Sequence, residues 1–185
     1  MIDIAQEAPQ TAIVAEDEAS LYLQATTERV WAPKGQTPVI RVDPGRESTH
    51  FFGTLDLRTG AEIAMRSEQM NATTTAEHLQ QVLDAIPDVP ILLLWDKAPW
   101  HRGEPIQKIL EANPRLEIIR FPTASPDLNP QEHVWKAVRS TISHNHRQEK
   151  LDVLADKFEQ HLNSQTFTSS FLDSYGFNSL AAMFT

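Results

Sequence analysis

The sequence contains no cysteine among its 185 residues. Disulfide bonds and zinc sites with thiolate ligands are therefore excluded, and the composition is typical of a reducing compartment. Long apolar segments are also missing: the most apolar run, residues 91–95, has the length of a buried strand and cannot cross a bilayer. The first residues lack the basic start and apolar stretch of a signal peptide. We expect a cytoplasmic protein with no membrane partner.

Basic residues are scarce as well. Lys and Arg number 16 against 25 acids, which gives a net charge of −9, and no basic residue precedes Arg29. Because phosphate binding normally needs a basic face, this charge argues against general affinity for nucleic acid. The acids can form a solvated surface or hold cations. Charge alone leaves the partner open.

No repeat, low-complexity tract or linker divides the chain, so we expect one domain over residues 1–185. Its opening is strand-rich. Residues 11–15 predict a buried strand that ends at the acidic residues 16–18. The patterns that follow predict a ribbon and then a hairpin, formed by residues 29–31 with 39–42 and by residues 50–55 with 61–65.

The second half alternates between helical and strand patterns. Thr74 and Glu77 are spaced as a capping box at the start of an amphipathic helix. The later elements expected are a strand at 91–95, a helix from Pro105, a strand at 116–121, a helix capped by Asn129 with Pro130 at its first position, and an amphipathic helix over 151–162. This order favours an α/β protein with a mixed sheet and helices on both faces.

Two of the predicted strands lead into aspartates, Asp17 and Asp96. In open α/β sheets, ligands bind outside the carboxyl ends of the strands, so parallel neighbours would present both carboxylates at one edge. Taken singly, either aspartate is more readily a turn residue, because Asp ends many strands in that role.

A third acid, Glu132, lies in the first turn of the helix expected after Pro130. The helix dipole favours an ionised carboxylate there, as a metal ligand requires. Alternatively, Glu132 is an ordinary first-turn acid that stabilises the helix by roughly 0.3–1 kcal/mol. Asp127 competes for the ligand role, but its place before Asn129 favours a role in bracing the turn.

Three carboxylates suit phosphodiester chemistry. Mg²⁺ and Mn²⁺ prefer oxygen ligands, and two such ions about 3.5–4 Å apart can activate an attacking oxygen and stabilise a leaving one. This chemistry needs no protein nucleophile, and the sequence offers no convincing Ser-His-Asp or Cys-His arrangement.

Four segments resemble the DDE transposases of bacterial insertion sequences, in the mariner-type superfamily: residues 16–20, 31–38, 95–101 and 125–136. The last is the most specific, with Ser-Pro-x-Leu-Asn-Pro-x-Glu followed by Trp. Residues 97–131, 35 in all, separate Asp96 from Glu132, which is similar to that family's spacing. The resemblance spans about residues 11–140.

The resemblance implies a ribonuclease H-like fold with a mixed five-stranded sheet. It implies that Asp17, Asp96 and Glu132 are both the catalytic and the metal-binding residues, with two Mg²⁺ or Mn²⁺ ions per site. The implied reaction is DNA strand cleavage followed by attack of the freed 3′-hydroxyl on target DNA. The implied partners are transposon ends, target DNA, and either a second copy or a chain that carries a DNA-binding domain.

Four residues near this site are candidates for contact with DNA: Lys97, His101, Arg102 and Lys136. His101 matches a family position and is interpreted as orienting substrate or loop rather than binding metal. We expect the isolated chain to bind DNA weakly and without sequence preference.

Departures from the family pattern keep two alternatives open. Lys97 stands where Asn is frequent, and Ala124 where an aromatic residue is common. We also expect no helix-turn-helix domain before the catalytic strands. The alternatives are a ribonuclease H-like nuclease without strand transfer, and a decayed relic that acts only through protein association.

Repulsion among three clustered carboxylates is expected to raise the pKa of at least one of them. By the same reasoning, Asp96→Asn is expected to stabilise the metal-free domain.

Overall fold

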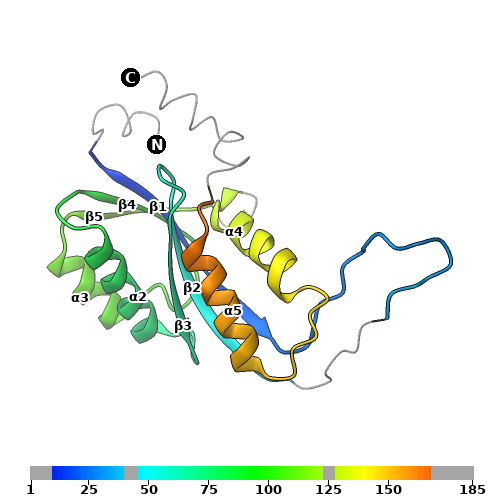
Figure 1. The fold of residues 1–185 in the computed structure, drawn as a ribbon. Helices are drawn as coiled ribbons and strands as arrows, with labels where there is room; N and C mark the ends of the chain where they lie inside the picture. The colour runs from blue at the N-terminus through cyan, green and yellow to red at the C-terminus, as the bar shows by residue number, and fades with distance from the viewer. Residues whose placement is uncertain (1–9, 40–45, 123–127, 168–185) are drawn as a thin grey trace, which may run out of the picture.

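The computed structural model describes residues 10–39, 46–122 and 128–167. A five-stranded sheet runs through the centre of the molecule, in the order β3-β2-β1-β4-β5 (Figure 1). The strands are β1 (Ala12–Tyr22), β2 (Ser48–Asp56), β3 (Glu62–Ser67), β4 (Ile91–Trp95) and β5 (Leu116–Arg120).

Strand β1 joins an antiparallel half of the sheet to a parallel half. It pairs antiparallel with β2, which pairs antiparallel with β3, whereas β1, β4 and β5 are parallel. Strand β4 is buried at every residue, as its continuous apolar sequence predicts for a parallel strand covered on both faces. The mixed sheet expected from the sequence is confirmed.

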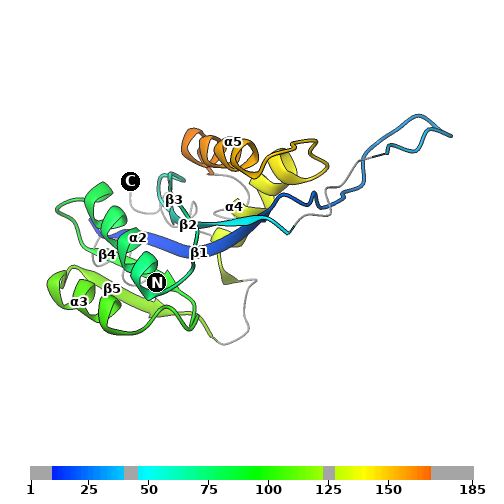
Figure 2. The same ribbon diagram turned by 90° about the horizontal axis from the view of Figure 1, so that it is seen from below.

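Two pairs of helices cover the two faces of the sheet (Figures 1 and 2). Helices α2 (Ala72–Ala85) and α3 (Glu104–Ala112) lie on one face, with Val14, Leu79 and Trp95 in the core beneath them. Helices α4 (Gln131–Val138) and α5 (Leu151–Ser164) lie on the other, over a core that contains Phe51, Trp135 and Phe158. No helix among the described residues is long and apolar enough to span a membrane.

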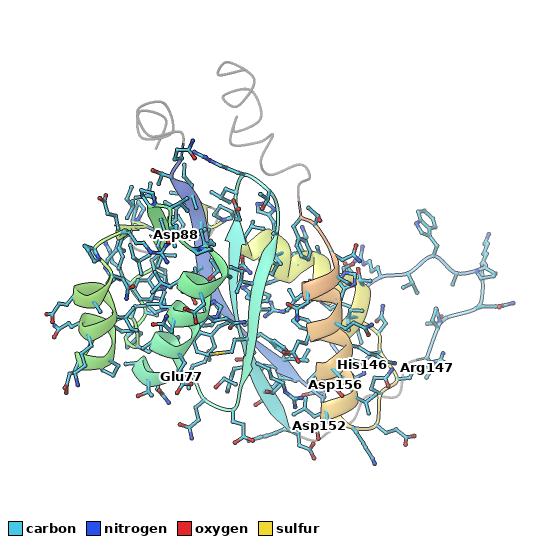
Figure 3. All side chains as sticks on the ribbon, turned by 60° about the vertical axis from the view of Figure 1, so that its left-hand side comes forward. Glu77, Asp88, His146, Arg147, Asp152 and Asp156 are labelled. Carbon is cyan, nitrogen blue, oxygen red and sulfur yellow. The ribbon has the colours of Figure 1, made fainter. Side chains whose placement is uncertain are left out.

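Helix α5 is also tied to the edge strand β3. Arg66 of β3 pairs with Asp152 at 2.5 Å and with Asp156 at 3.4 Å, the two α5 side chains labelled in Figure 3. Because the acids are exposed, each pair contributes at most about 1 kcal/mol. The apolar face of α5, rather than these ion pairs, holds the helix on the sheet.

Two expectations for strands are corrected by the structure. Strand β1 does not end at residues 16–18 but continues to Tyr22, because pairing with β2 satisfies its backbone and Ala19 and Leu21 are buried. Residues 29–31 form no strand, and Trp31 is fully exposed on a segment that projects from the sheet (Figures 1 and 2). Residues 40–42 of the expected ribbon lie outside the described residues.

The capping box of α2 lies three residues earlier than expected. Asn71 accepts hydrogen bonds from the backbone N–H groups of Thr73 and Thr74, and the Thr74 hydroxyl accepts one from the Asn71 N–H at 3.1 Å. Asn is among the strongest N-cap residues, so it begins the helix ahead of Thr74.

Candidate functional site

Asp17 and Asp96 lie at the carboxyl edge of the parallel pair β1 and β4. The parallel register ends at Ala15 and Leu94, two residues before the two aspartates. Both Ala15 and Leu94 belong to the core under α4 and α5. Because side chains alternate along a strand, Asp17 points to that same face. Its partner across the antiparallel pair is Gly53 of β2.

Glu132 approaches this edge from helix α4, which packs on β1 and β2. Asn129 accepts a hydrogen bond from the Gln131 N–H at 3.1 Å, but the N-cap is Pro130, which the sequence placed at the first helical position, so the helix begins one residue later than expected. Glu132 falls in that first turn and is exposed. Helix α4 itself lies on the face of the sheet to which Asp17 points.

Electrostatics tie the three acids together. Burial, followed by the charge of Glu18 and then by the charges of Glu132 and Asp96, raises the pKa of Asp17 to about 7. The charges of Glu132 and Asp96 are smaller causes of this shift than burial and Glu18. One of the three acids thus has a raised pKa as expected, but burial and Glu18, rather than the other two acids, are the main causes.

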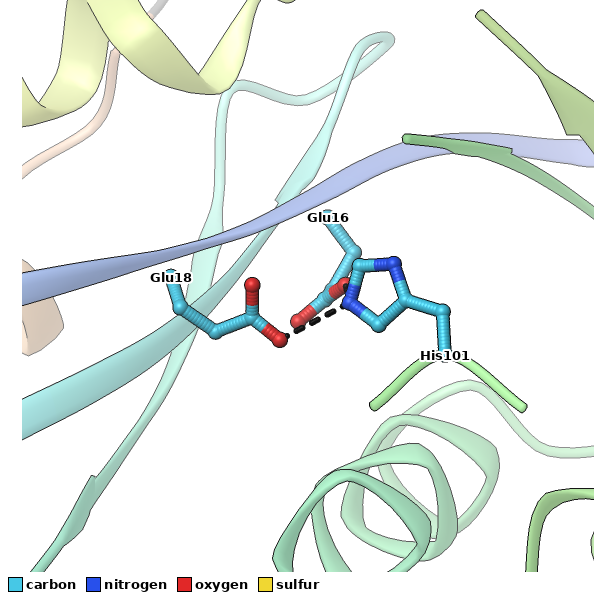
Figure 4. A group of neighbouring side chains, drawn as sticks. All are labelled: Glu16, Glu18 and His101. Atoms are coloured by element: carbon cyan, nitrogen blue, oxygen red, sulfur yellow. Dashed lines mark hydrogen bonds and ion pairs between the residues drawn. The ribbon is translucent and has the colours of Figure 1, made fainter. Parts of the chain in front are cut away.

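Glu16 and Glu18 point to the opposite face of β1, where His101 joins them (Figure 4). Nδ1 of His101 lies 2.7 Å from Oδ1 of Asp96, and Nε2 lies 2.9 Å from Oε1 of Glu18. The same Nε2 is 3.7 Å from Oε2 of Glu16. His101 thus bridges Asp96 to the acids behind the sheet.

Tryptophans complete this bridge. Trp100 donates its Nε1–H to Glu18 at 2.8 Å, and Trp95 donates to Glu16. The ring of His101 stacks on Trp95 with centroids 4.1 Å apart. These contacts fix the imidazole plane, and with it the direction of the bond to Asp96.

His101 carries a positive charge at neutral pH. Burial lowers the pKa of its ring, but the hydrogen bonds to Asp96 and Glu18 and their charges outweigh burial and raise the pKa to about 9. Glu16, Glu18 and His101 lie close enough to hold a metal ion. A doubly protonated ring has no lone pair for a metal. The protonated ring nitrogens of His101 instead donate hydrogen bonds to the carboxylates of Asp96 and Glu18.

Residues 12–155, which contain all three acids, match the family model described as DDE superfamily endonuclease. The chain belongs to this family.

Relatives of this DDE superfamily chain come from insertion elements and transposases. It is 26% identical over 134 residues to the insertion element IS630 uncharacterized 39 kDa protein of Shigella sonnei. The aligned residues make up 71% of this chain and 39% of that protein. Two solved structures are similar in fold. The Mos1 transposase paired-end complex with left transposon end has a TM-score of 0.66 at 16% identity, covering 90% of this chain and 52% of that one. The Mos1 mariner paired end complex with Mn has a TM-score of 0.65 at 16% identity, covering 90% and 53%.

These matches support the ribonuclease H-like fold expected from the sequence. The chain spans about two-fifths of the length of the insertion-element relative and about half of the Mos1 chains.

The structure separates the four candidates for DNA contact. Lys97, Arg102 and Lys136 are exposed, whereas His101 is only 1% exposed and holds Asp96 and Glu18. His101 therefore offers no surface to DNA, and its assignment as a DNA contact is corrected to one within the protein. Asp127 and Ala124 lie outside the described residues.

Sequence reasoning missed a residue that holds the loop after β4. Arg120 of β5 donates to the carbonyl oxygens of Asp96 at 2.9 Å and His101 at 3.1 Å. Its guanidinium also lies 5.2 Å from the centroid of Trp95. No local pattern marks this role, although the alternation of Glu16 and Glu18 about Asp17 could have indicated a second acidic face.

The expected effect of Asp96→Asn is reversed by this geometry. The hydrogen bond from His101 holds the pKa of Asp96 below its usual range, so the charge of Asp96 is already compensated. Because a lowered pKa stabilises the fold above the unfolded value of about 3.9 and the effect is lost at lower pH, Asp96→Asn should cost stability near pH 7. With the side chain 45% exposed, solvent screening limits the loss to about 1 kcal/mol.

Urea unfolding at pH 7 and pH 3 measures this loss, which should shrink at pH 3. Asp84→Asn, an exposed site on α2, is the control. A gain in unfolding free energy at pH 7 would show that repulsion among the acids outweighs the His101 pair.

Proposed function

We propose that this chain is the catalytic domain of a transposase that cleaves DNA and joins the freed 3′-hydroxyl to target DNA. Asp17, Asp96 and Glu132 are its catalytic and metal-binding residues. The observation that carries the proposal is the place of Asp17 and Asp96 just beyond the parallel register of β1 and β4, with the charges of Glu132 and Asp96 among the causes that raise the pKa of Asp17 to about 7. The insertion-element relative and the Mos1 complexes support the same reading.

The acids fit a divalent cation. Carboxylate oxygens are the ligands that Mg²⁺ and Mn²⁺ prefer, and the ionised form of Asp17 is disfavoured near neutral pH unless a cation offsets the charges around it. Two bound ions would supply activation of the attacking oxygen and stabilisation of the leaving oxygen. The Mn-bound Mos1 structure, similar in fold, supports a divalent metal here.

The remaining residues orient the acids and the DNA. His101 holds one carboxylate oxygen of Asp96, and Arg120 holds the carbonyl of the same residue, so Asp96 is oriented before DNA arrives. Lys97 follows Asp96 directly, and Lys136 lies one turn after Glu132 on α4. These two lysines and Arg102 are proposed to contact the DNA backbone.

Two measurements test the proposal. Calorimetric titration with Mn²⁺ reports metal binding, with EDTA-treated protein and Ca²⁺ as controls. Incubation with supercoiled plasmid and a labelled oligonucleotide ending in a 3′-hydroxyl then reports nicking and joining. Binding with both reactions supports a transposase. Nicking without joining indicates a nuclease, and absence of Mn²⁺ binding indicates a decayed relic.

DNA binding by the chain alone is predicted to be weak and insensitive to sequence. With a net charge of −9 and few exposed basic residues near the acids, we expect a Kd of roughly 10⁻⁴ M at physiological salt. The slope of log K against log salt concentration is negative, and Lys136→Gln should make it less steep by about 1, because one phosphate contact is lost. Recognition of transposon ends is then proposed to come from a partner with a DNA-binding domain.

Fluorescence anisotropy over a salt series measures both quantities. Lys108→Gln serves as a control, because Lys108 lies on α3 across the sheet and pairs with Glu104. Submicromolar, sequence-selective binding by the isolated chain would contradict the prediction.

A further inference from the structure

Gly53 lets helix α4 lie unusually close to the sheet. The residue sits in β2 between Asp17 of β1 and Ala64 of β3. A Cβ atom placed on it would lie 2.4 Å from Nε2 of Gln131 and 2.6 Å from Cη2 of Trp135, both on α4. Side chains do not tolerate such distances, so a residue with a Cβ at position 53 would displace the ends of Gln131 and Glu62 and press on the Trp135 ring of α4.

Gln131 and Glu62 fasten the helix at the same point. Gln131 is fully buried at the start of α4, and its Nε2 donates to Oε1 of Glu62 at 2.5 Å. That oxygen would also lie 2.4 Å from a Cβ on Gly53. The first residue of α4 is therefore joined to the first residue of β3 directly above Gly53.

This arrangement is costly for stability. Oε2 of Glu62, Oε1 of Gln131 and Nε1 of Trp135 are buried without a hydrogen-bond partner within the described part of the chain. Buried polar atoms without partners destabilise a fold, and apolar groups of the same shape would serve packing at least as well. We therefore interpret the hydrogen bond between Gln131 and Glu62 as one that positions α4 on the sheet rather than one that stabilises the fold.

We propose that Gly53, Glu62 and Gln131 are positioning residues that set the height and rotation of α4, and thereby bring Glu132 to Asp17. Glu132 directly follows Gln131, and Asp17 is the strand partner of Gly53. A shift of the helix at Gln131 is therefore a shift of Glu132 relative to Asp17. The inference rests on the proposed metal site formed by these acids.

The chemistry of Glu62 allows matched variants. Burial raises the pKa of Glu62 well above its usual range, which favours the neutral acid, and Oε1 of Glu62 accepts a hydrogen bond from Gln131. Glu62→Gln keeps an acceptor oxygen. Glu62→Met keeps the length and approximate volume of the side chain but removes the acceptor.

The test measures Mn²⁺ affinity by calorimetry and unfolding by urea for each variant. Glu62→Gln should bind Mn²⁺ within about threefold of the native sequence. Glu62→Met should bind at least about tenfold more weakly, as is typical when support behind a metal ligand is lost, while its stability is unchanged or higher. Gly53→Ala should also lose about tenfold or more, and Trp135→Phe, which removes the Cη2 contact, should restore part of that loss in the double variant.

Leu83→Ala, in the core on the other face, controls for general destabilisation: its stability should fall while its Mn²⁺ affinity is unchanged. Equal loss of affinity in Leu83→Ala and Glu62→Met would overturn the inference. So would native affinity in both Glu62→Met and Gly53→Ala, although the proposed metal site would then stand. If the native chain binds no Mn²⁺, the proposed function fails and the inference fails with it. Should Gly53→Ala not fold, the two Glu62 variants decide.

Discussion

Glu132→Gln is expected to lower the rate of Mn²⁺-dependent DNA nicking by about 10³-fold while leaving the fold intact. Glu132 is exposed in the first turn of α4, so the amide disturbs no core contact. A neutral amide is a poorer ligand than a carboxylate, and charge stabilisation of this kind contributes about 10²–10³-fold to rate in comparable sites.

The measurement is the initial rate of plasmid nicking at fixed Mn²⁺, with urea unfolding to verify the fold. Glu149→Gln, another exposed acid outside α4, is the control and should retain the native rate. Native activity in Glu132→Gln would remove Glu132 from the triad, and Asp17→Asn and Asp96→Asn would then show whether two acids suffice.

Asp17→Asn is expected to stabilise the metal-free protein at neutral pH. The folded pKa of Asp17 is about 7 against an ordinary value of 3.8, so the folded state holds a proton that the unfolded state releases between those values. Stability contributed by the protonated group is complete below about pH 4 and is lost as pH rises to about 7. The loss is on the order of 2–4 kcal/mol, and Asn, which cannot ionise, avoids it.

Urea unfolding from pH 4 to pH 8 measures this difference, which should grow through the window and level off above pH 7. Asp84→Asn should run parallel to the native sequence. Parallel curves for Asp17→Asn and the native chain would show that Asp17 does not carry the raised pKa.

Mn²⁺ should reverse the loss in the native chain. A ligand that binds only the folded state raises stability by about 2.7 kcal/mol at 100 times its Kd. The rise in melting temperature should be larger at pH 7.5 than at pH 5.5, because Asp17 must lose its proton to bind. Asp17→Asn should abolish most of the rise. An equal rise at both pH values would place the metal away from Asp17.

Local patterns in the sequence determined most of the elements. Three elements followed directly from local signals. The continuous apolar run predicted the buried strand β4, Pro105 predicted the start of α3, and the spacing of apolar residues predicted the amphipathic helix α5. Local strand and helix signals placed the acids at 17, 96 and 132, but only the resemblance of the surrounding segments to DDE transposases singled them out as a triad. Their role as the metal-binding triad stays a prediction.

Tertiary structure alone decided what surrounds those acids. The course of β1 past residues 16–18 depends on pairing with β2, whose partner residues lie 26 to 32 positions further along the chain. The burial of His101 depends on Glu18, 83 positions earlier in the chain. The need for glycine at position 53 appears only once α4 rests on β2. Sequence periodicity specifies which side of an element is apolar, but the partner that covers it, and therefore the pKa and direction of each buried acid, follows from contacts between segments far apart in the chain.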